Sequence, residues 1–205
     1  MNRREHSCTG TLARPHSRFS DKLAFLLNNS VRRYLSPPER LLSKLDIGPR
    51  DVVLDFGCGP GFYTVAIARM AGKAIGVDVS QRMLEKAREH VQRNRVSVEF
   101  LESDGREIRL ADASVNLIIL GHVFHEIEDR PRVLREFSRI LKPLGRLAII
   151  ERTQRGKLLA GFGPPIISEA EVVQEVTQAG FTFANTMPHG KDSIIVGRRP
   201  GSADD

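Results

Sequence analysis

The 205-residue sequence has only 2 cysteines, no tryptophan and no long apolar run. Cys8 lies in a polar, basic stretch and Cys58 lies inside a glycine-rich turn, so we predict neither a disulfide framework nor a zinc site. No apolar run approaches the roughly 18–20 residues of a membrane span. The basic first residues lack an apolar core, which argues against a secretory signal. These absences favour a globular protein of the reducing cytoplasm, with no metal and no membrane span.

Positive charge is concentrated at one end of the chain. Residues 1–50 contain ten Lys or Arg and four Asp or Glu, whereas the rest of the chain contains 21 of each. A basic segment suits a nucleic acid, an acidic lipid or an acidic substrate. It has no dense block of like charge and no interleaved aromatic residues of the kind that stack bases. We interpret it as a solvated tail, and a nucleic acid partner stays an alternative.

Composition divides the chain into four parts. Residues 1–17 are expected to be a disordered basic tail, and residues 200–205 a short disordered tail. Residues 18–47 have apolar positions at helical spacing and a proline-containing helix start after Ser36. We expect them to form N-terminal helices that cover the active site. Residues 48–199 are expected to form the main domain.

Within the main domain, apolar strand patterns alternate with amphipathic helix patterns. Strands are expected at 51–56, 73–79, 96–103, 115–121 and 145–152, and helices at 61–72, 80–93, 130–143 and 168–180. Ser80 is a candidate cap for one helix, and Ser168 with Glu171 forms a capping box for another. Two last strands, 181–187 and 193–199, are joined by the short turn PHGKD.

This alternation determines the expected topology. Strands separated by helices imply right-handed crossovers and parallel pairing, whereas the short last turn requires an antiparallel pair. We therefore predict an α/β fold: a doubly wound, Rossmann-like, seven-stranded sheet. It is mostly parallel, with a C-terminal antiparallel hairpin and helices on both faces. In such sheets ligands bind beyond the carboxyl ends of the strands.

The stretch VVLDFGCGPGFYT, residues 52–64, is a glycine-rich turn after a buried strand. The dinucleotide fingerprint G-x-G-x-x-G requires its third glycine where this chain has Phe62, and the third glycine is instead Gly61. Asp55 lies two residues before the first glycine, where a carboxylate would repel pyrophosphate. The turn therefore suits a ligand that is cationic at this end.

This turn resembles the first motif of class I S-adenosylmethionine-dependent methyltransferases, and the resemblance continues from about Pro37 to Arg198. AIGVDVSQRMLEKARE resembles the second motif, and FLESDGREI resembles the third. VNLIILGHVFHEIED and VLREFSRILKPLGRLAIIE resemble the small-molecule, quinone-biosynthesis-like branch, methyltransferase type 11. The resemblance implies S-adenosylmethionine as the cofactor and S-adenosylhomocysteine as its product.

The resemblance also implies the cofactor contacts. Asp55 would support the turn and help recognise the ammonium, Asp78 would accept from the ribose hydroxyls, and Asp104 would accept from the adenine amino group. The other expected cofactor residues are Gly57, Gly59 and Gly61 in the turn, Val79 and Met83 as apolar walls for adenine, Gly105 beside the ring, and Gly121 after the fourth strand. An acid at position 78 also matches the NAD fingerprint, so it does not distinguish the two cofactors.

Methyl transfer releases a neutral thioether, so alignment and exclusion of water provide most of the catalysis. A base matters only when the acceptor must lose a proton of high pKa. His122 and His125 are the candidates, and the alternative for His125 is that it caps its turn and ties it to the neighbouring helix. Tyr34, Tyr63 and Phe162 are expected to line the acceptor pocket.

We therefore predict methyl transfer from S-adenosylmethionine to an O, N, S or C nucleophile of a small-molecule acceptor. Three alternatives stay open: an RNA or protein methyltransferase recruited by the basic N-terminal segment, a cofactor-binding module without catalysis, and an NAD-binding oxidoreductase. The sequence indicates no oligomeric state.

Overall fold

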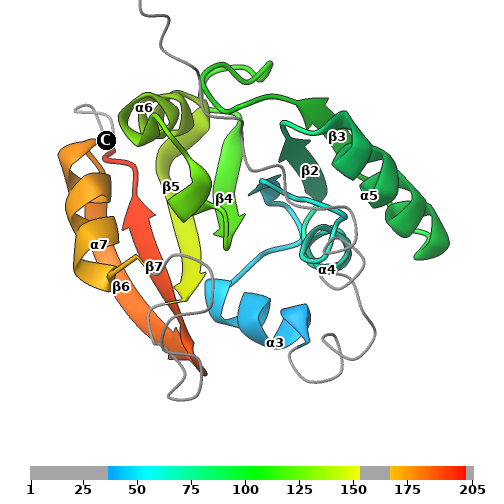
Figure 1. The fold of residues 1–205 in the computed structure, drawn as a ribbon, viewed down its shortest axis with the longest axis horizontal. Helices are drawn as coiled ribbons and strands as arrows, with labels where there is room; N and C mark the ends of the chain where they lie inside the picture. Colours follow the sequence, from blue (N-terminus) through cyan, green and yellow to red (C-terminus); the bar gives the residue numbers. More distant parts are fainter. Residues whose placement is uncertain (1–36, 153–166, 202–205) are drawn as a thin grey trace, which may run out of the picture.

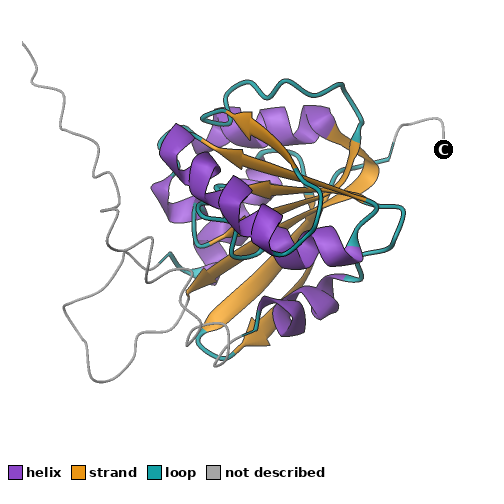
Figure 2. Ribbon diagram, turned by 90° about the vertical axis from the view of Figure 1, so that its right-hand side faces the viewer, coloured by secondary structure: helices purple, strands orange, loops and turns teal. Residues whose placement is uncertain are grey.

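The computed structural model describes residues 37–152 and 167–201, which form one seven-stranded sheet with helices on both faces (Figures 1 and 2). The strands are β1 (Val52–Phe56), β2 (Lys73–Asp78), β3 (Glu99–Glu102), β4 (Val115–Gly121), β5 (Leu141–Arg152), β6 (Thr182–His189) and β7 (Asp192–Arg198). The helices are α3 (Pro38–Leu42), α4 (Thr64–Met70), α5 (Gln81–Arg93), α6 (Arg130–Ile140) and α7 (Glu169–Gln178), with short 3-10 turns η1 (Ser43–Leu45) and η2 (Phe124–Glu126). The predicted fold class is confirmed.

The strand order is β3-β2-β1-β4-β5-β7-β6. Strands β1 to β5 pair in parallel, whereas β7 runs antiparallel to both β5 and β6. The order reverses at β1, which lies between β2 and β4. The carboxyl ends of these three strands therefore form the topological switch point, where sheets of this kind bind ligands.

Apolar side chains fill both faces of the sheet. On the face covered by α6 and α7, the rings of Phe56 and Phe137 pack edge to face with their centroids 5.0 Å apart. On the face covered by α3 and α4, Leu42 and Ile67 are fully buried against β1, β4 and β7. Both faces of the central strands are covered, which explains why β4 has an almost wholly apolar sequence.

Several helix starts follow from their capping residues. The Ser80 side chain accepts from the Met83 backbone N–H at 3.4 Å, as predicted. The capping box of Ser168 and Glu171 is present, with both reciprocal hydrogen bonds. Asp129 caps α6, and a proline lies in the first turn of that helix. Each cap satisfies backbone donors that the first helical turn would leave without partners.

The helix expected at 130–143 is shorter than predicted. It ends at Ile140, because Leu141 adopts an extended conformation (φ −68°, ψ 140°) and pairs with Val115. Pro143 disfavours helical backbone at the residue before it, so the chain cannot continue the helix to this point. Strand β5 therefore begins at Leu141 and not at Gly145, and it is twelve residues long.

Other boundaries also differ from the predictions. Helix α4 begins at Thr64 and not at residue 61, because the preceding turn has glycines at positive φ. Strand β3 covers Glu99–Glu102 and not the whole of 96–103. The last turn contracts to Gly190 and Lys191, because β6 and β7 extend into the PHGKD segment.

The N-terminal expectations are only partly described. The chain enters the described part at Pro37, and α3 is a five-residue helix followed directly by η1. The predicted tail 1–17, residues 18–36 with Tyr34, Phe162, and residues 202–205 of the predicted last tail lie outside the described residues. Within residues 37–152 and 167–201, no helix combines the length and the apolarity that a membrane span needs.

The Phe56–Phe137 contact gives a stability prediction. Phe137 is fully buried, so Phe137→Ala should lower the free energy of unfolding by about 3–5 kcal/mol through lost burial and a cavity. Urea denaturation of the full chain measures this change. Arg135→Ala, an exposed position on the same helix, should stay within about 0.5 kcal/mol of wild type. Equal losses in the two variants would contradict the assignment of Phe137 to the core.

Candidate functional site

The glycine turn lies at the switch point, directly after β1. Gly57, Gly59 and Gly61 all have positive φ, at 66°, 51° and 85°. A Cβ at Gly57 would lie 2.5 Å from the Val123 side chain, so this position admits no larger residue. Among residues 37–152 and 167–201, a Cβ at Gly59 would meet nothing within 4 Å, so these residues leave the space above Gly59 open to a ligand. The turn therefore combines one closely packed glycine with one that faces free space.

Asp78, at the end of β2, holds the turn in place. One carboxylate oxygen accepts from the Gly59 backbone N–H at 2.8 Å, and the other accepts from the Ser80 backbone N–H at 2.9 Å. Burial raises the pKa of Asp78, and its backbone donors partly oppose that shift. A carboxylate has about four acceptor positions, so two backbone bonds leave capacity for a ligand's hydroxyl groups.

Asp55 lies beneath the turn and is 2% exposed. Its carboxylate accepts from the Thr64 hydroxyl at 2.5 Å, which links the end of β1 to the start of α4. Burial raises the pKa of Asp55 to about 7, and the nearby Asp78 carboxylate adds to the shift, whereas the Thr64 bond opposes it. This bond accounts for the predicted support of the turn, and recognition of an ammonium stays a prediction.

The residues expected around adenine lie at the carboxyl ends of β2 and β3. Val79 is a large apolar side chain that is 67% exposed, and Met83 is half-buried on α5. Asp104 is exposed, and its carboxylate accepts from the Arg106 backbone N–H at 3.0 Å. Gly105 has φ 87°, and a Cβ there would lie 2.6 Å from the Phe56 ring. The described structure thus brings these residues to one side of the turn.

Two side chains of α6 make hydrogen bonds to the long connection between β3 and β4. The Glu136 carboxylate accepts from the Ile108 N–H at 2.7 Å, and Arg139 donates to Glu136 and to the carbonyls of Ile108 and Leu110. The hydrogen bonds from Arg139 hold the pKa of Glu136 below its usual range. This clamp explains how a connection without a helix of its own keeps the loop carrying Asp104 in one arrangement.

Gly121 and Tyr63 are in direct contact. A Cβ at Gly121 would lie 2.4 Å from the Tyr63 ring, so the close packing of the ring on β4 requires a glycine there. Tyr63 is 8% exposed and packs edge to face on Phe62, with centroids 5.0 Å apart. Most of the Tyr63 side chain therefore belongs to the core, and its role in an acceptor pocket stays a prediction.

His122 follows β4 with a left-handed backbone, at φ 60°. Its backbone N–H donates to the Ile150 carbonyl at 2.8 Å, which continues the β4–β5 pairing by one residue. Its Nε2 lies 3.5 Å from the Asp192 carboxylate at the start of β7. Such a backbone is uncommon outside glycine, and here the sheet hydrogen bond maintains it.

His125, in η2, is held by Glu151 near the end of β5. The Nδ1 atom lies 3.0 and 3.1 Å from the two Glu151 oxygens, and the His125 backbone N–H donates to the same carboxylate at 3.3 Å. Glu151 is 2% exposed. Its hydrogen bond raises the pKa of His125 above the usual value, against the effect of burial. The Nε2 atom lies 3.8 Å from Glu126, on the side away from Glu151.

The alternative role predicted for His125 is only half right. The η2 turn is tied to the neighbouring helix α6, but Arg130 makes that link by donating to the Phe124 carbonyl at 3.1 Å and to the His125 carbonyl at 3.4 Å. The His125 side chain instead bonds to strand β5. The histidine ring is therefore oriented by a buried carboxylate and not used to bridge to α6.

Sequence reasoning missed Glu151, Thr64 and Asp192. Glu151 had a usable signal, because it is an acid near the carboxyl end of an apolar strand, the same kind of position that Asp55 and Asp78 occupy. Thr64 and Asp192 carry no such signal, since their partners lie nine residues or more away in sequence. Tyr34 and Phe162 are outside the described residues.

The described residues fit the expected cofactor. Gly59 leaves open space above the turn, Asp78 keeps acceptor capacity beside it, and Val79 presents an apolar surface at the end of β2. A nucleoside with a hydroxyl pair and an aromatic base matches this combination of an acceptor next to an apolar surface.

Comparison with known proteins agrees with this fit. The model of a methyltransferase domain family matches residues 54–149. A demethylmenaquinone methyltransferase of Lactobacillus johnsonii is 30% identical over 121 residues, 57% of this chain and 50% of the relative. The methyltransferase GfsG of Streptomyces halstedii is 37% identical over 123 residues, 58% of this chain and 44% of the relative. The chain thus spans about half the length of the curated relatives it matches.

A solved structure matches over a greater length. A SAM-dependent methyltransferase from Aquifex aeolicus superposes with a TM-score of 0.80 at 29% identity. The match covers 89% of this chain and all of that chain. The similarity therefore extends over more of the chain than the segment that the family model matches.

The raised pKa of Asp55 predicts a pH dependence of stability. Folded Asp55 keeps its proton up to about pH 7, whereas an unfolded aspartate loses it near 3.8. The stabilising contribution is therefore present below about pH 4 and is lost as the pH rises through about 7. Urea denaturation at several pH values should show wild type losing stability relative to Asp55→Asn between these limits. A pH-independent difference, or one of opposite sign, would contradict the buried, proton-retaining carboxyl.

Proposed function

We propose that this chain, which belongs to the class I S-adenosylmethionine-dependent methyltransferases, transfers a methyl group from S-adenosylmethionine to a small-molecule acceptor. The observation that carries the proposal is the Asp78 carboxylate. This carboxylate accepts a hydrogen bond from the Gly59 N–H at the switch point, next to the open space above Gly59. A carboxylate placed there can accept both hydroxyls of a ribose.

The turn is poorly suited to a dinucleotide. Phe62 occupies the position of the third fingerprint glycine, and its ring is buried in the packing between helix and sheet. Helix α4 begins only at Thr64, whose hydroxyl is bonded to the Asp55 carboxylate. The Asp55 carboxyl near this helix start is ionised above about pH 7 and then repels a pyrophosphate. These features favour the sulfonium nucleoside over NAD.

Each part of the site has one role in the proposed reaction. Asp78 holds the ribose, Val79 and Met83 contact adenine, and the Gly57–Gly61 turn admits the methionine portion to close backbone approach. When bound, S-adenosylmethionine supplies an electrophilic methyl group and leaves as a neutral thioether. The chain then has to align the acceptor with that methyl group and exclude water.

His125 is the proposed base for an acceptor that must lose a proton. In the neutral ring Nδ1 carries the hydrogen, which it donates to Glu151, so Nε2 has the free lone pair. Nε2 would accept the proton that the acceptor loses when it takes the methyl group, and the ring would later return that proton to solvent. Glu151 is a positioning residue, because it fixes the ring orientation and stabilises the protonated ring.

A small-molecule acceptor is supported by the relatives. The L. johnsonii relative is a demethylmenaquinone methyltransferase, and its name gives demethylmenaquinone as the methyl acceptor. The family match and the two histidines fit an acceptor with an ionisable hydroxyl or an activated carbon. Such a group gains most from a base with a raised pKa near neutral pH.

The cofactor assignment predicts the effect of Asp78→Asn. The amide keeps the size of the side chain but removes the charge, so S-adenosylhomocysteine should bind at least about tenfold more weakly, from loss of charge-assisted hydrogen bonds. Calorimetry of the full chain measures this change. Glu102→Gln, an exposed acid that ends β3, is the matched control and should bind normally. Tighter binding of NADH than of S-adenosylhomocysteine by wild type would overturn the proposal.

The base assignment predicts the effects of two substitutions. With an acceptor identified from a panel by release of S-adenosylhomocysteine, His125→Gln should lower turnover by about 10²–10⁴-fold and leave cofactor affinity unchanged. Glu151→Gln should move the rise of kcat to lower pH, because the carboxylate is what raises the pKa of His125.

Asp192→Asn provides the comparison, because Asp192 faces His122 and not His125. A pH shift in this variant alone would assign the base to His122. Normal turnover by His125→Gln would mean that the ring only supports the turn.

A further inference from the structure

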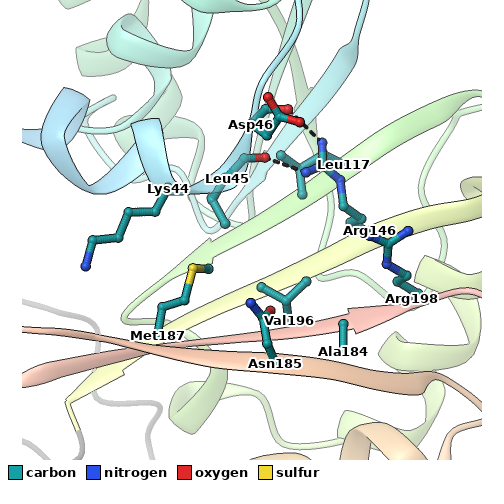
Figure 3. A pocket seen from close by; sticks show the side chains of 10 residues that line it. All are labelled: Lys44, Leu45, Asp46, Leu117, Arg146, Ala184, Asn185, Met187, Val196 and Arg198. Carbon is teal, nitrogen blue, oxygen red and sulfur yellow. Dashed lines mark hydrogen bonds between the residues drawn. The ribbon is translucent and has the colours of Figure 1, made fainter.

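A cavity of about 480 Å³ is lined by residues other than those of the glycine turn (Figure 3). It is bounded by η1 and by strands β4, β5, β6 and β7, and none of the expected cofactor residues lines it. Arg146 of the cavity and Glu151 of the site are both on β5, five residues or roughly 16 Å of strand apart. The cavity is therefore separate from the proposed methyl transfer site.

The cavity has an apolar part. Leu45, Leu117 and Val196 contribute buried aliphatic side chains, and the half-buried Met187 adds its thioether. A volume of this size lies within the usual range for small-molecule pockets, which are mostly apolar with a few convergent polar groups. The apolar part suits a hydrocarbon or aromatic body and not a fully charged ligand.

Two arginines lie at one end of the cavity. Arg146 and Arg198 are directly opposite each other in the β5–β7 register, so their side chains leave the sheet on the same face. Figure 3 shows them together at one end, with Lys44 at the other. Like charges directly opposite on neighbouring strands destabilise a sheet. This pairing is therefore unfavourable unless anions offset both charges.

In the described part of the chain, only the charge of Arg146 is offset by an acid. Arg146 donates to the Leu45 carbonyl at 2.5 Å and to the Asp46 carbonyl at 3.1 Å, and its guanidinium lies 3.8 Å from the Asp51 carboxylate. These bonds satisfy the carbonyls at the end of η1, so Arg146 has a structural role. Arg198 is exposed, and within residues 37–152 and 167–201 its guanidinium has no hydrogen bond or ion pair, although its backbone pairs with β5 and β6.

Lys44 adds a further cation at the far end. Its Nζ donates to the Pro188 carbonyl at 2.7 Å, which holds η1 against the β6–β7 hairpin. Three cations and one acid, Asp46, thus line the cavity. The net charge favours an anionic ligand, and the planar guanidinium of Arg198 matches a carboxylate by two parallel hydrogen bonds.

We propose that this cavity binds a small amphipathic carboxylate, with its carboxylate on Arg198 and its apolar body against Leu117, Val196 and Met187. The carboxylate lies between the paired arginines and offsets the charge that the protein leaves uncompensated. The apolar body replaces water against the aliphatic side chains. This binding does not depend on the proposed methyl transfer.

The test uses octanoate as the probe, the full chain and titration calorimetry. Wild type should bind octanoate, and Arg198→Gln should bind it at least about tenfold more weakly, as expected for loss of a charge-assisted pair. Lys191→Gln removes the same charge from the β6–β7 turn outside the cavity and should bind octanoate like wild type. 1-Octanol, the neutral match of the probe, should bind more weakly than octanoate.

A second variant tests the site by adding a negative charge to the cavity. Ala184 is exposed and lines the cavity, so Ala184→Glu places a competing carboxylate there and should abolish octanoate binding. S-Adenosylhomocysteine affinity should be the same in wild type and in all three variants, which shows that the chains are folded and keeps this test distinct from the cofactor proposal.

Four results would overturn the proposal. They are no octanoate binding by wild type, equal binding of octanol, an equal loss in Lys191→Gln, and competition between octanoate and S-adenosylhomocysteine. The last result would place the probe in the methyl transfer site.

Discussion

The hydrogen bond from the Gly59 N–H to the Asp78 carboxylate is the interaction on which the site depends. It joins the turn after β1 to the end of β2, two of the three strands whose carboxyl ends form the switch point. The turn can adopt this path only because its glycines accept positive φ. Asp55 and Thr64 support the same turn from below. One carboxylate thus shapes the turn and keeps acceptor capacity for the ligand that the turn admits.

The polar groups of the site share a structural logic. Asp55, Asp78 and Glu151 each lie at or near the carboxyl end of a strand and directly follow apolar residues of that strand. Each carboxylate is partly or fully buried and is bonded to a neighbouring element, a turn or a helix start. Burial strengthens such bonds and makes an unpaired group costly, so these acids fix the loops around the site in single arrangements.

The two ends of the same strands carry different chemistry. At the carboxyl ends, acids and histidines surround a turn that suits a cationic nucleoside. Toward the amino ends of β4 and β5, Arg146, Arg198 and Lys44 line an apolar cavity. The parallel strands β4 and β5 have their first residues at one end of the sheet and their last residues at the other. Arg198 lies with the first residues of β5 because β7 is antiparallel to β5. The two ends of the sheet can therefore bind different ligands without shared residues.

Periodicity and turn chemistry predicted most of the fold, and the errors in the predicted boundaries have specific causes. The pattern over 130–143 predicts one helix, because an apolar Leu141 fits the helical spacing. In the structure Leu141 is instead buried in strand β5, where it pairs with Val115. The capping box of α7 and the antiparallel pairing of β6 with β7 could be predicted because the partners are close in sequence.

The sequence by itself determined the doubly wound, mostly parallel type of sheet, the glycine turn and the acids near the ends of the first two strands. These features depend on local patterns and backbone restrictions. Only the tertiary structure decided that Glu151 orients His125, that the Tyr63 ring packs on Gly121, and that Arg146 faces Arg198. These contacts join residues 26 to 58 positions apart, and strand register and helix packing bring them together. No local pattern encodes that register, since it results from the burial of all the strands at once.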